Sequence, residues 1–139
     1  MSATLLTGIA RTTEPRTMLR RFLALDAVVT GVNGAAYLAA SGPLGRLLGM
    51  DREFLLGVGA FILLYGIAVG ALAARPAPAP LAVKAVIELN LLYAALSIAS
   101  LALWLDPSAA GAVWVPLQAA TVAGFALLQW SALRAGARG

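Results

Sequence analysis

The sequence predicts an all-α protein, a four-transmembrane-helix antiparallel bundle with almost nothing outside the bilayer. Of its 139 residues, 61% are hydrophobic and only 12% are charged, whereas a soluble domain carries about 45–50% apolar and about 25% charged residues. Four apolar segments follow one another, each reaching the roughly 20 residues that a helix needs to cross a membrane. This composition excludes a disordered chain and an ordinary soluble enzyme.

The four apolar segments cover residues 19–40, 54–74, 81–105 and 113–133. Alanine and leucine dominate them, and both residues favour helix. The alternating polarity of membrane β-strands is absent. We therefore expect a transmembrane domain at 19–134, preceded by a polar cytoplasmic tail at 1–18 and followed by a short tail at 135–139.

The connections between these segments contain residues that end helices. Residues 41–53 hold several glycines and a proline, with leucines that predict a short interfacial turn. Residues 75–80 contain three alternating prolines, which oppose helix and favour a stiff extended link. Asp106-Pro107-Ser108 predicts a tight turn with a cap for the next helix. Because all three connections are short, successive helices should be antiparallel neighbours.

The basic residues predict the orientation of the bundle. Only Arg46 and Arg52 lie on one side, and the other eight of the ten lysines and arginines lie on the opposite side: Arg11, Arg16, Arg20, Arg21, Arg75, Lys84, Arg134 and Arg138. Cytoplasmic loops are enriched in these residues. We therefore expect both termini in the cytoplasm and a multi-pass protein of the cell inner (plasma) membrane. A cleaved signal peptide is disfavoured, because the first apolar run contains Asp26 and exceeds the usual 7–15 residues.

The residue types that are missing exclude much chemistry. The chain has no cysteine and no histidine, so disulfides, zinc sites with Cys or His ligands and Ser-His-Asp triads are excluded. No phosphate-binding glycine loop and no nucleophile elbow occurs. We expect no catalytic residue, no cofactor and no metal. The net charge of +4 is interpreted as contact with the lipid bilayer, not with nucleic acid.

Ionisable side chains inside the membrane are the most informative feature of the chain. An isolated one costs about 2.5–3.5 kcal/mol at the centre of a span. Asp26 and Glu88 lie about two turns into the first and third helices, both from the cytoplasmic side, and Gln129 falls at the same level. At 1.5 Å rise per residue, each carboxylate lies roughly 10 Å deep.

Polar residues in the first and fourth helices extend this level into a candidate site. In the first helix the spacing is four, three and four residues, which places them on one face. Lipid cannot satisfy such a face. Two polar layers across the bundle are therefore predicted, and together they form a candidate intramembrane polar site: Asp26, Thr30, Asn33, Tyr37, Glu88, Gln118 and Gln129.

The third helix has two separate polar faces. Glu88 groups with Lys84, one turn earlier, whereas Asn90 begins another stripe. Two residues are about 200° apart around a helix, so Glu88 and Asn90 point in opposite directions. One face can line the bundle, and the other is available to a neighbouring helix, a second copy or another protein. In the second helix, Gly66 and Gly70 form a small-xxx-small pair that favours close helix approach.

Three interpretations of the Asp26 and Glu88 level remain open. It can be purely structural, with Lys84 and Glu88 forming an ion pair at the membrane edge. It can bind a proton, a cation or a ligand, because two carboxylates held close do not both ionise cheaply. It can also contact a partner subunit.

The layout of residues 17–134 resembles a known group of membrane proteins. The first helix ends in Ala39-Ala40-Ser41-Gly42-Pro43-Leu44, an amphipathic outer segment follows through Leu48, and the second helix is glycine-rich between Gly57 and Gly70. In these features the chain resembles the small four-helix bacterial proteins called DoxX-like and other small integral membrane proteins of actinobacteria. The resemblance implies a membrane location and an accessory role, and it supplies no active residues.

The leading functional hypothesis is a small non-catalytic accessory or scaffold subunit that packs against partners through its helix faces. The two polar faces of the third helix motivate it. The alternative is a homodimeric proton- or cation-coupled transporter or channel, in which Asp26 and Glu88 take up the ion and Asn33, Tyr37 and Gln118 contact the ligand. A third hypothesis is a lipid-modifying enzyme that uses the two carboxylates as acid and base.

Overall fold

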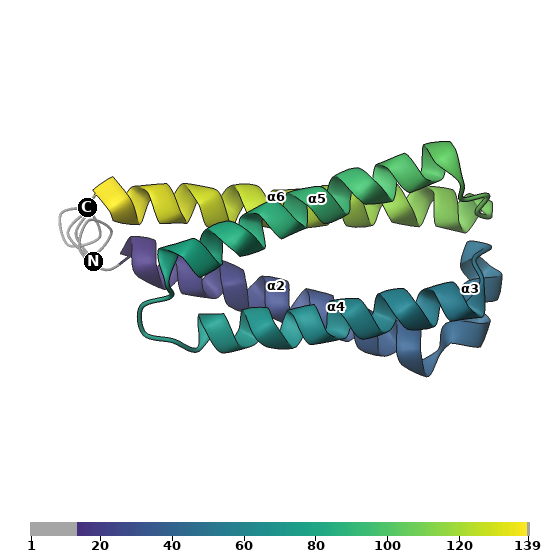
Figure 1. Ribbon diagram of the computed structural model, residues 1–139, viewed down its shortest axis with the longest axis horizontal. Coiled ribbons are helices and arrows are strands. Elements are labelled where there is room, and N and C mark those ends of the chain that lie inside the picture. Colours follow the sequence, from purple (N-terminus) through teal and green to yellow (C-terminus); the bar gives the residue numbers. More distant parts are fainter. Residues whose placement is uncertain (1–13, 139) are drawn as a thin grey trace, which may run out of the picture.

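The computed structural model describes residues 14–138, and this part of the chain is all-helical. Four helices are long and apolar enough to span a membrane: α2 (Glu14–Ala39), α4 (Arg52–Ala73), α5 (Pro80–Leu103) and α6 (Ala109–Arg138). A short helix, α3 (Ser41–Leu48), lies between α2 and α4. The predicted fold class is therefore confirmed. Figure 1 shows an elongated bundle in which the start of α2 and the end of α6 lie at one end, here called the terminal end, opposite α3.

Two helices extend into segments predicted as tails, and the helix starts have local causes. α2 begins within the predicted 1–18 tail, where Pro15 suits a first helical turn; residues 1–13 lie outside the described part. α6 begins directly after Ser108, whose hydroxyl accepts a hydrogen bond from the Gly111 N–H at 3.2 Å and caps the helix. α6 also takes in most of the predicted 135–139 tail. α5 begins at Pro80, the last of the three alternating prolines.

The segment predicted as an interfacial turn is the helix α3, which is fixed to the start of α6. α3 is followed by Gly49 in the left-handed conformation, with φ of 71°, which a glycine adopts without strain. Ser108 then donates twice to the end of α3, from its backbone N–H to the Leu48 carbonyl at 3.1 Å and from its hydroxyl to the Leu47 carbonyl at 2.5 Å. These contacts close the α3 end of the bundle.

Glycines bring α2 and α4 into close contact. A Cβ atom built at Gly59 would lie 2.8 Å from the Tyr37 Cβ, and one at Gly66 would lie 2.9 Å from the Gly31 backbone nitrogen. Neither position leaves room for a side chain. At Gly70 a Cβ would meet only Ala27, at an ordinary 3.6 Å. The prediction that Gly66 and Gly70 allow the close helix approach is thus wrong for Gly70, because α2 and α4 approach closely at Gly59 and Gly66.

The remaining contacts leave one seam of the bundle open. α2 packs against both α4 and α6, and α5 packs against α6, whereas α4 and α5 touch at few points. One apolar core lies towards the terminal end and includes Leu23, Val69 and Val83. A second lies towards α3 and includes Leu55 and Ile62. The polar side chains of the bundle gather next to these two cores and along the α4–α5 seam.

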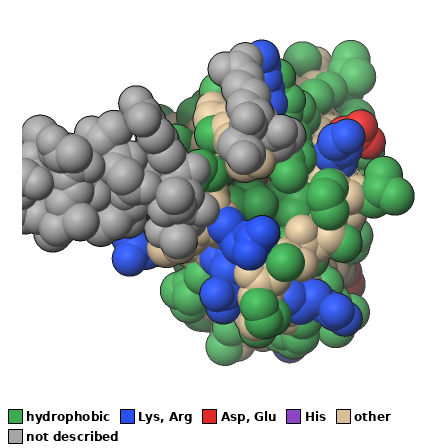
Figure 2. Space-filling model, turned by 90° about the vertical axis from the view of Figure 1, so that its left-hand side faces the viewer, with side chains coloured by type: hydrophobic (Ala, Val, Ile, Leu, Met, Phe, Trp, Pro, Cys, Tyr) green, Lys and Arg blue, Asp and Glu red, His purple; other side chains and the backbone are tan. Residues whose placement is uncertain are grey.

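Basic side chains gather at the terminal end (Figure 2). The described ones come from the start of α2, the α4–α5 connection, the start of α5 and the end of α6: Arg16, Arg20, Arg21, Arg75, Lys84 and Arg134. The Arg20 Nε donates to the Ala73 carbonyl at 3.0 Å. That contact satisfies a carbonyl in the last turn of α4, where the helix dipole favours a positive charge. Arg11, which the orientation argument also used, lies outside the described residues.

Candidate functional site

The Asp26 carboxylate is the centre of the polar interior. Its side chain is 0% exposed. The Thr30 hydroxyl donates to Oδ1 at 2.9 Å, and the Asn90 and Gln129 amides each donate to Oδ2 at 2.8 Å. In all three contacts a side-chain group of the bundle donates to a carboxylate oxygen of Asp26. Within residues 14–138, hydrogen bonds and not an ion pair stabilise this carboxylate.

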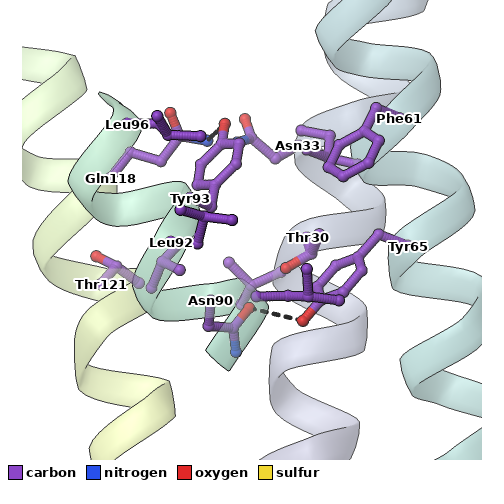
Figure 3. A pocket seen from close by; sticks show the side chains of 14 residues that line it. Thr30, Asn33, Phe61, Tyr65, Asn90, Leu92, Tyr93, Leu96, Gln118 and Thr121 are labelled. Atoms are coloured by element: carbon purple, nitrogen blue, oxygen red, sulfur yellow. Dashed lines mark hydrogen bonds between the residues drawn. The ribbon is translucent and has the colours of Figure 1, made fainter. Parts of the chain in front are cut away.

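These contacts belong to a network that includes one residue or more from every spanning helix. Asn90 Nδ2 also donates to Gln129 Oε1 at 3.2 Å. The Tyr65 hydroxyl donates to both Asn90 Oδ1 and the Val86 carbonyl oxygen, each at 3.0 Å. Figure 3 shows the bond to Asn90. We call this network the inner cluster: Asp26 and Thr30 of α2, Tyr65 of α4, Asn90 of α5 and Gln129 of α6. It links α4 to α5, which otherwise make few contacts.

Glu88 does not belong to the inner cluster, although it was predicted at the same level. Its side chain is exposed on the outer face of α5, whereas Asn90 is buried. Only one of the two can point into the bundle, because they lie about 200° apart around the helix. Asn90 suits the interior position, since an amide can donate to Asp26 and accept from Tyr65 at once. Within one copy of the chain, the carboxylates of Asp26 and Glu88 therefore do not contact each other.

A second network, the outer cluster, lies closer to α3. It consists of Tyr37 of α2, Tyr93 of α5, and Trp114 and Gln118 of α6. The Trp114 indole N–H donates to the Tyr37 hydroxyl at 2.6 Å, and that hydroxyl donates to Gln118 Oε1 at 3.3 Å. Gln118 Nε2 then donates to the Tyr93 hydroxyl at 3.2 Å. Tyr37 and Gln118 were predicted in this layer, and the structure joins them directly.

Asn33, the remaining predicted site residue, lies at a cavity in the α4–α5 seam. In Figure 3 its amide points from α2 towards Tyr93 and Gln118. The cavity has a volume of about 120 Å³ and is lined by all four spanning helices. Its walls are apolar, with Phe61 and Leu92 among them, and its polar lining includes Thr30, Asn90 and Tyr93. We call it the seam cavity.

A second cavity continues the seam towards α3. It measures about 210 Å³ and shares Tyr93, Leu96 and Gln118 with the seam cavity. The two cavities therefore meet at the outer cluster. An arrangement of apolar walls with a few placed polar groups is typical of a site that holds and orients a small molecule. Among the described residues, no three His, Cys, Asp or Glu side chains gather to hold a metal ion.

Four residues of these clusters were not in the predicted site: Tyr65, Asn90, Tyr93 and Trp114. Sequence signals existed for two of them. Asn90 and Tyr93 begin a polar stripe on the face of α5 opposite Glu88, and that stripe faces the interior. Tyr65 and Trp114 carry weaker signals, because a tyrosine or tryptophan in a membrane helix is as readily explained by packing or by interfacial anchoring.

The chain matches no family model, no curated protein and no solved structure.

Proposed function

We propose that this small multi-pass protein is a non-catalytic accessory subunit of the plasma membrane, which binds a partner membrane protein through the outer face of α5. The observation that carries the proposal is the position of Glu88. It is exposed and lies eight residues after Pro80, so about 12 Å from the start of α5. Facing lipid there, an ionisable side chain is unfavourable, with a cost of up to about 3 kcal/mol, the value at the centre of a span. A partner helix that presents a basic or hydrogen-bonding side chain would remove this cost.

Lys84 of the same chain does not fully offset the cost of exposing the Glu88 carboxylate to lipid. Both side chains are exposed, one turn apart on α5. The lysine lies only about 6 Å from the helix start, and its long side chain can extend its ammonium group towards the lipid headgroups. Glu88 is deeper and its side chain is shorter. Charge complementarity therefore favours a partner with a cation at the depth of Glu88.

The rest of the outer α5 face is suited to helix packing. Exposed residues follow one another at intervals of four and three: Lys84, Glu88, Leu91, Ala95, Ile98 and Ala102. This spacing places them on one stripe along the helix. The two alanines allow close approach of a second helix, as small residues do at helix contacts in membranes.

The environment of Asp26 supports a non-catalytic role. Both of its oxygens accept hydrogen bonds from side chains of the same bundle, and its side chain is fully buried. A general acid or base must reach its substrate, and Asp26 is directed instead at holding helices together. The transport alternative used Asp26 and Glu88 jointly, so with Glu88 on the outer face it requires a second copy to complete the site.

The test is native mass spectrometry of the protein gently extracted from its own membrane, with wild type, Glu88→Gln and Glu53→Gln compared. Glu53 is a matched control, because it is an exposed glutamate at the α3 end of the bundle. We expect a stoichiometric foreign subunit with wild type and with Glu53→Gln. The same subunit should be depleted at least tenfold with Glu88→Gln, which corresponds to the roughly 1.4 kcal/mol or more that a charged contact contributes.

Two results would overturn the proposal. A foreign subunit that is retained equally by Glu88→Gln would show that binding does not use this face. A homodimer that Glu88→Gln dissociates would replace the foreign partner by a second copy and favour the transport alternative. A photoreactive residue at Leu91 distinguishes these cases independently, because it should crosslink to the foreign subunit and not to another copy of this chain.

A further inference from the structure

We infer that the seam cavity is a binding site for a neutral membrane amphiphile, and that it recognises a carbonyl oxygen of that molecule, such as the carbonyl of a fatty-acyl ester. This site is separate from the outer face of α5. It lies between α4 and α5 and involves the opposite side of α5, so the inference does not depend on the proposed partner.

The hydrogen bonds of the outer cluster leave the Tyr93 hydroxyl as the group that can donate into the cavity. An indole N–H can only donate, so Trp114 makes the Tyr37 hydroxyl an acceptor. Tyr37 donates its own proton to Gln118 Oε1, and the other end of the same amide donates to the Tyr93 oxygen. The Gln118 amide thus uses an acceptor site of the Tyr93 hydroxyl and not its proton; among the described residues the Ser97 side chain is the other neighbour of this hydroxyl, and a guest acceptor would compete with it for the proton. Tyr93 lines both cavities of the seam, so the proton is available to a guest.

A hydrogen-bond donor inside an apolar cavity selects its guest. A buried donor without an acceptor is unfavourable, so a molecule that brings an acceptor is favoured over a pure hydrocarbon. A carbonyl oxygen provides that acceptor with little desolvation, whereas a charged group would lose its hydration in the cavity. Asn33 adds a second polar group beside Tyr93 (Figure 3), and it can contact the remaining polar atom of an ester.

The walls and the opening of the cavity indicate that the guest comes from the bilayer. Phe61 of α4 and Leu92 of α5 line the cavity and are themselves largely exposed on the surface of the bundle. That surface faces lipid in a membrane-spanning bundle. α4 and α5 make few contacts, and the tie between them at Tyr65 and Asn90 lies at one end of the cavity. An acyl chain can therefore enter sideways between the two helices and extend into the second cavity towards α3.

The probe is a monoacylglycerol ester with a diazirine in its acyl chain, and the matched probe is the ether in which a methylene replaces the carbonyl. Both are added to the full chain in vesicles of diether phosphatidylcholine, whose chains carry no competing carbonyl. After photolysis, labelled residues are mapped by mass spectrometry. We expect saturable labelling of the residues lining the α4–α5 seam, and an apparent affinity about 2- to 10-fold higher for the ester, as one hydrogen bond provides.

Two pairs of variants locate the effect. Tyr93→Phe should abolish the preference for the ester, while Ser131→Ala, which removes a hydroxyl from a position of α6 outside both cavities, should keep it. Leu92→Trp should fill the cavity and lower the labelling by both probes severalfold. Leu91→Trp, a neighbour that does not line the cavity, should leave labelling unchanged.

Equal saturable labelling of wild type by the ester and the ether would overturn the carbonyl preference. Labelling spread over the exposed leucines of all four helices would overturn the site itself. The comparison of the two probes uses wild-type protein, so it stands even if a variant fails to fold. A stoichiometric partner subunit, or its absence, changes neither result.

Discussion

The Asn90 amide and the Asp26 carboxylate are 64 positions apart in the chain, yet they form a buried hydrogen bond of 2.8 Å. That bond joins α5 to α2, two helices that pack mainly against other partners. Asn90 also contacts Tyr65 and Gln129, so it connects α4 to the carboxylate, which Gln129 of α6 contacts directly as well. The stability of the bundle should therefore depend on Asp26 far more than on Glu88.

Asp26→Asn should lower the free energy of unfolding by about 1–3 kcal/mol, because its new amide group would face donors and leave buried groups unpaired. Reversible unfolding in mixed detergent and dodecyl sulfate micelles measures this change. Glu88→Gln is the matched acid-to-amide control on the exposed face, and it should change the stability of the isolated chain by less than about 0.5 kcal/mol. Equal destabilisation by the two variants would contradict the assignment of Asp26 as the central residue.

Gly66→Ala should destabilise the α2–α4 contact by roughly 1–3 kcal/mol, because the added methyl group meets the backbone of Gly31. The same unfolding measurement applies. Gly57→Ala is the control, since a Cβ atom there meets nothing within 4 Å. It should be neutral or slightly stabilising, as expected for Gly→Ala in an exposed helix position. A harmless Gly66→Ala would show that the two helices are farther apart than described.

Ser108→Ala removes both the cap of α6 and the side-chain hydrogen bond to Leu47. We expect a loss of about 1 kcal/mol and faster amide exchange in the first turn of α6, measured by hydrogen–deuterium exchange. Ser131→Ala is a suitable comparison, because among the described residues the Ser131 hydroxyl bonds only to the Leu127 carbonyl, one turn back in the same helix. Its exchange pattern should match that of wild type. Unchanged exchange at the start of α6 in Ser108→Ala would argue against the cap.

The chain lacks cysteine, so single cysteines can report its orientation in the membrane. Ala77→Cys places a thiol in the exposed α4–α5 connection at the terminal end, and Asp51→Cys places one at the exposed start of α4. A membrane-impermeant maleimide added to intact cells should modify Asp51→Cys and spare Ala77→Cys, as the distribution of lysine and arginine predicts. Labelling with the opposite pattern would reverse the orientation.

The sequence was sufficient to predict the spanning helices, because their length and apolar character are local properties. Local chemistry placed the start of α5 well, at Pro80, and it offered Ser108 as a helix cap, although α6 begins at Ala109 and not at the predicted 113. The helical extent of residues 14–18 was not predictable from hydropathy, because the first turns of α2 are polar and can still be helical outside the hydrocarbon core. α3 needed the contact with the start of α6, which is invisible to a local pattern.

From the sequence it was possible to predict which polar residues share a helix face, but not which face of α5 points into the bundle. Thr30 and Tyr37 follow Asp26 at helical spacing, so their common face was evident. The choice between Glu88 and Asn90 depends on the rotation of α5 about its own axis. That rotation is fixed by which helices α5 packs against, and neither helical spacing nor net charge specifies it. The pairing of Gln118 with Tyr93 has the same origin, since it required the positions of α5 and α6 relative to each other.

The last member of the inner cluster to be synthesised is Gln129, in α6. α2, α4 and α5 leave the ribosome before α6 is complete. At that stage Asp26 lacks the hydrogen bond from Gln129. An incompletely solvated carboxylate disfavours release of these helices into lipid. They should therefore stay with the insertion machinery until α6 arrives, and a nascent chain that stops short of Gln129 should be a substrate for membrane proteases.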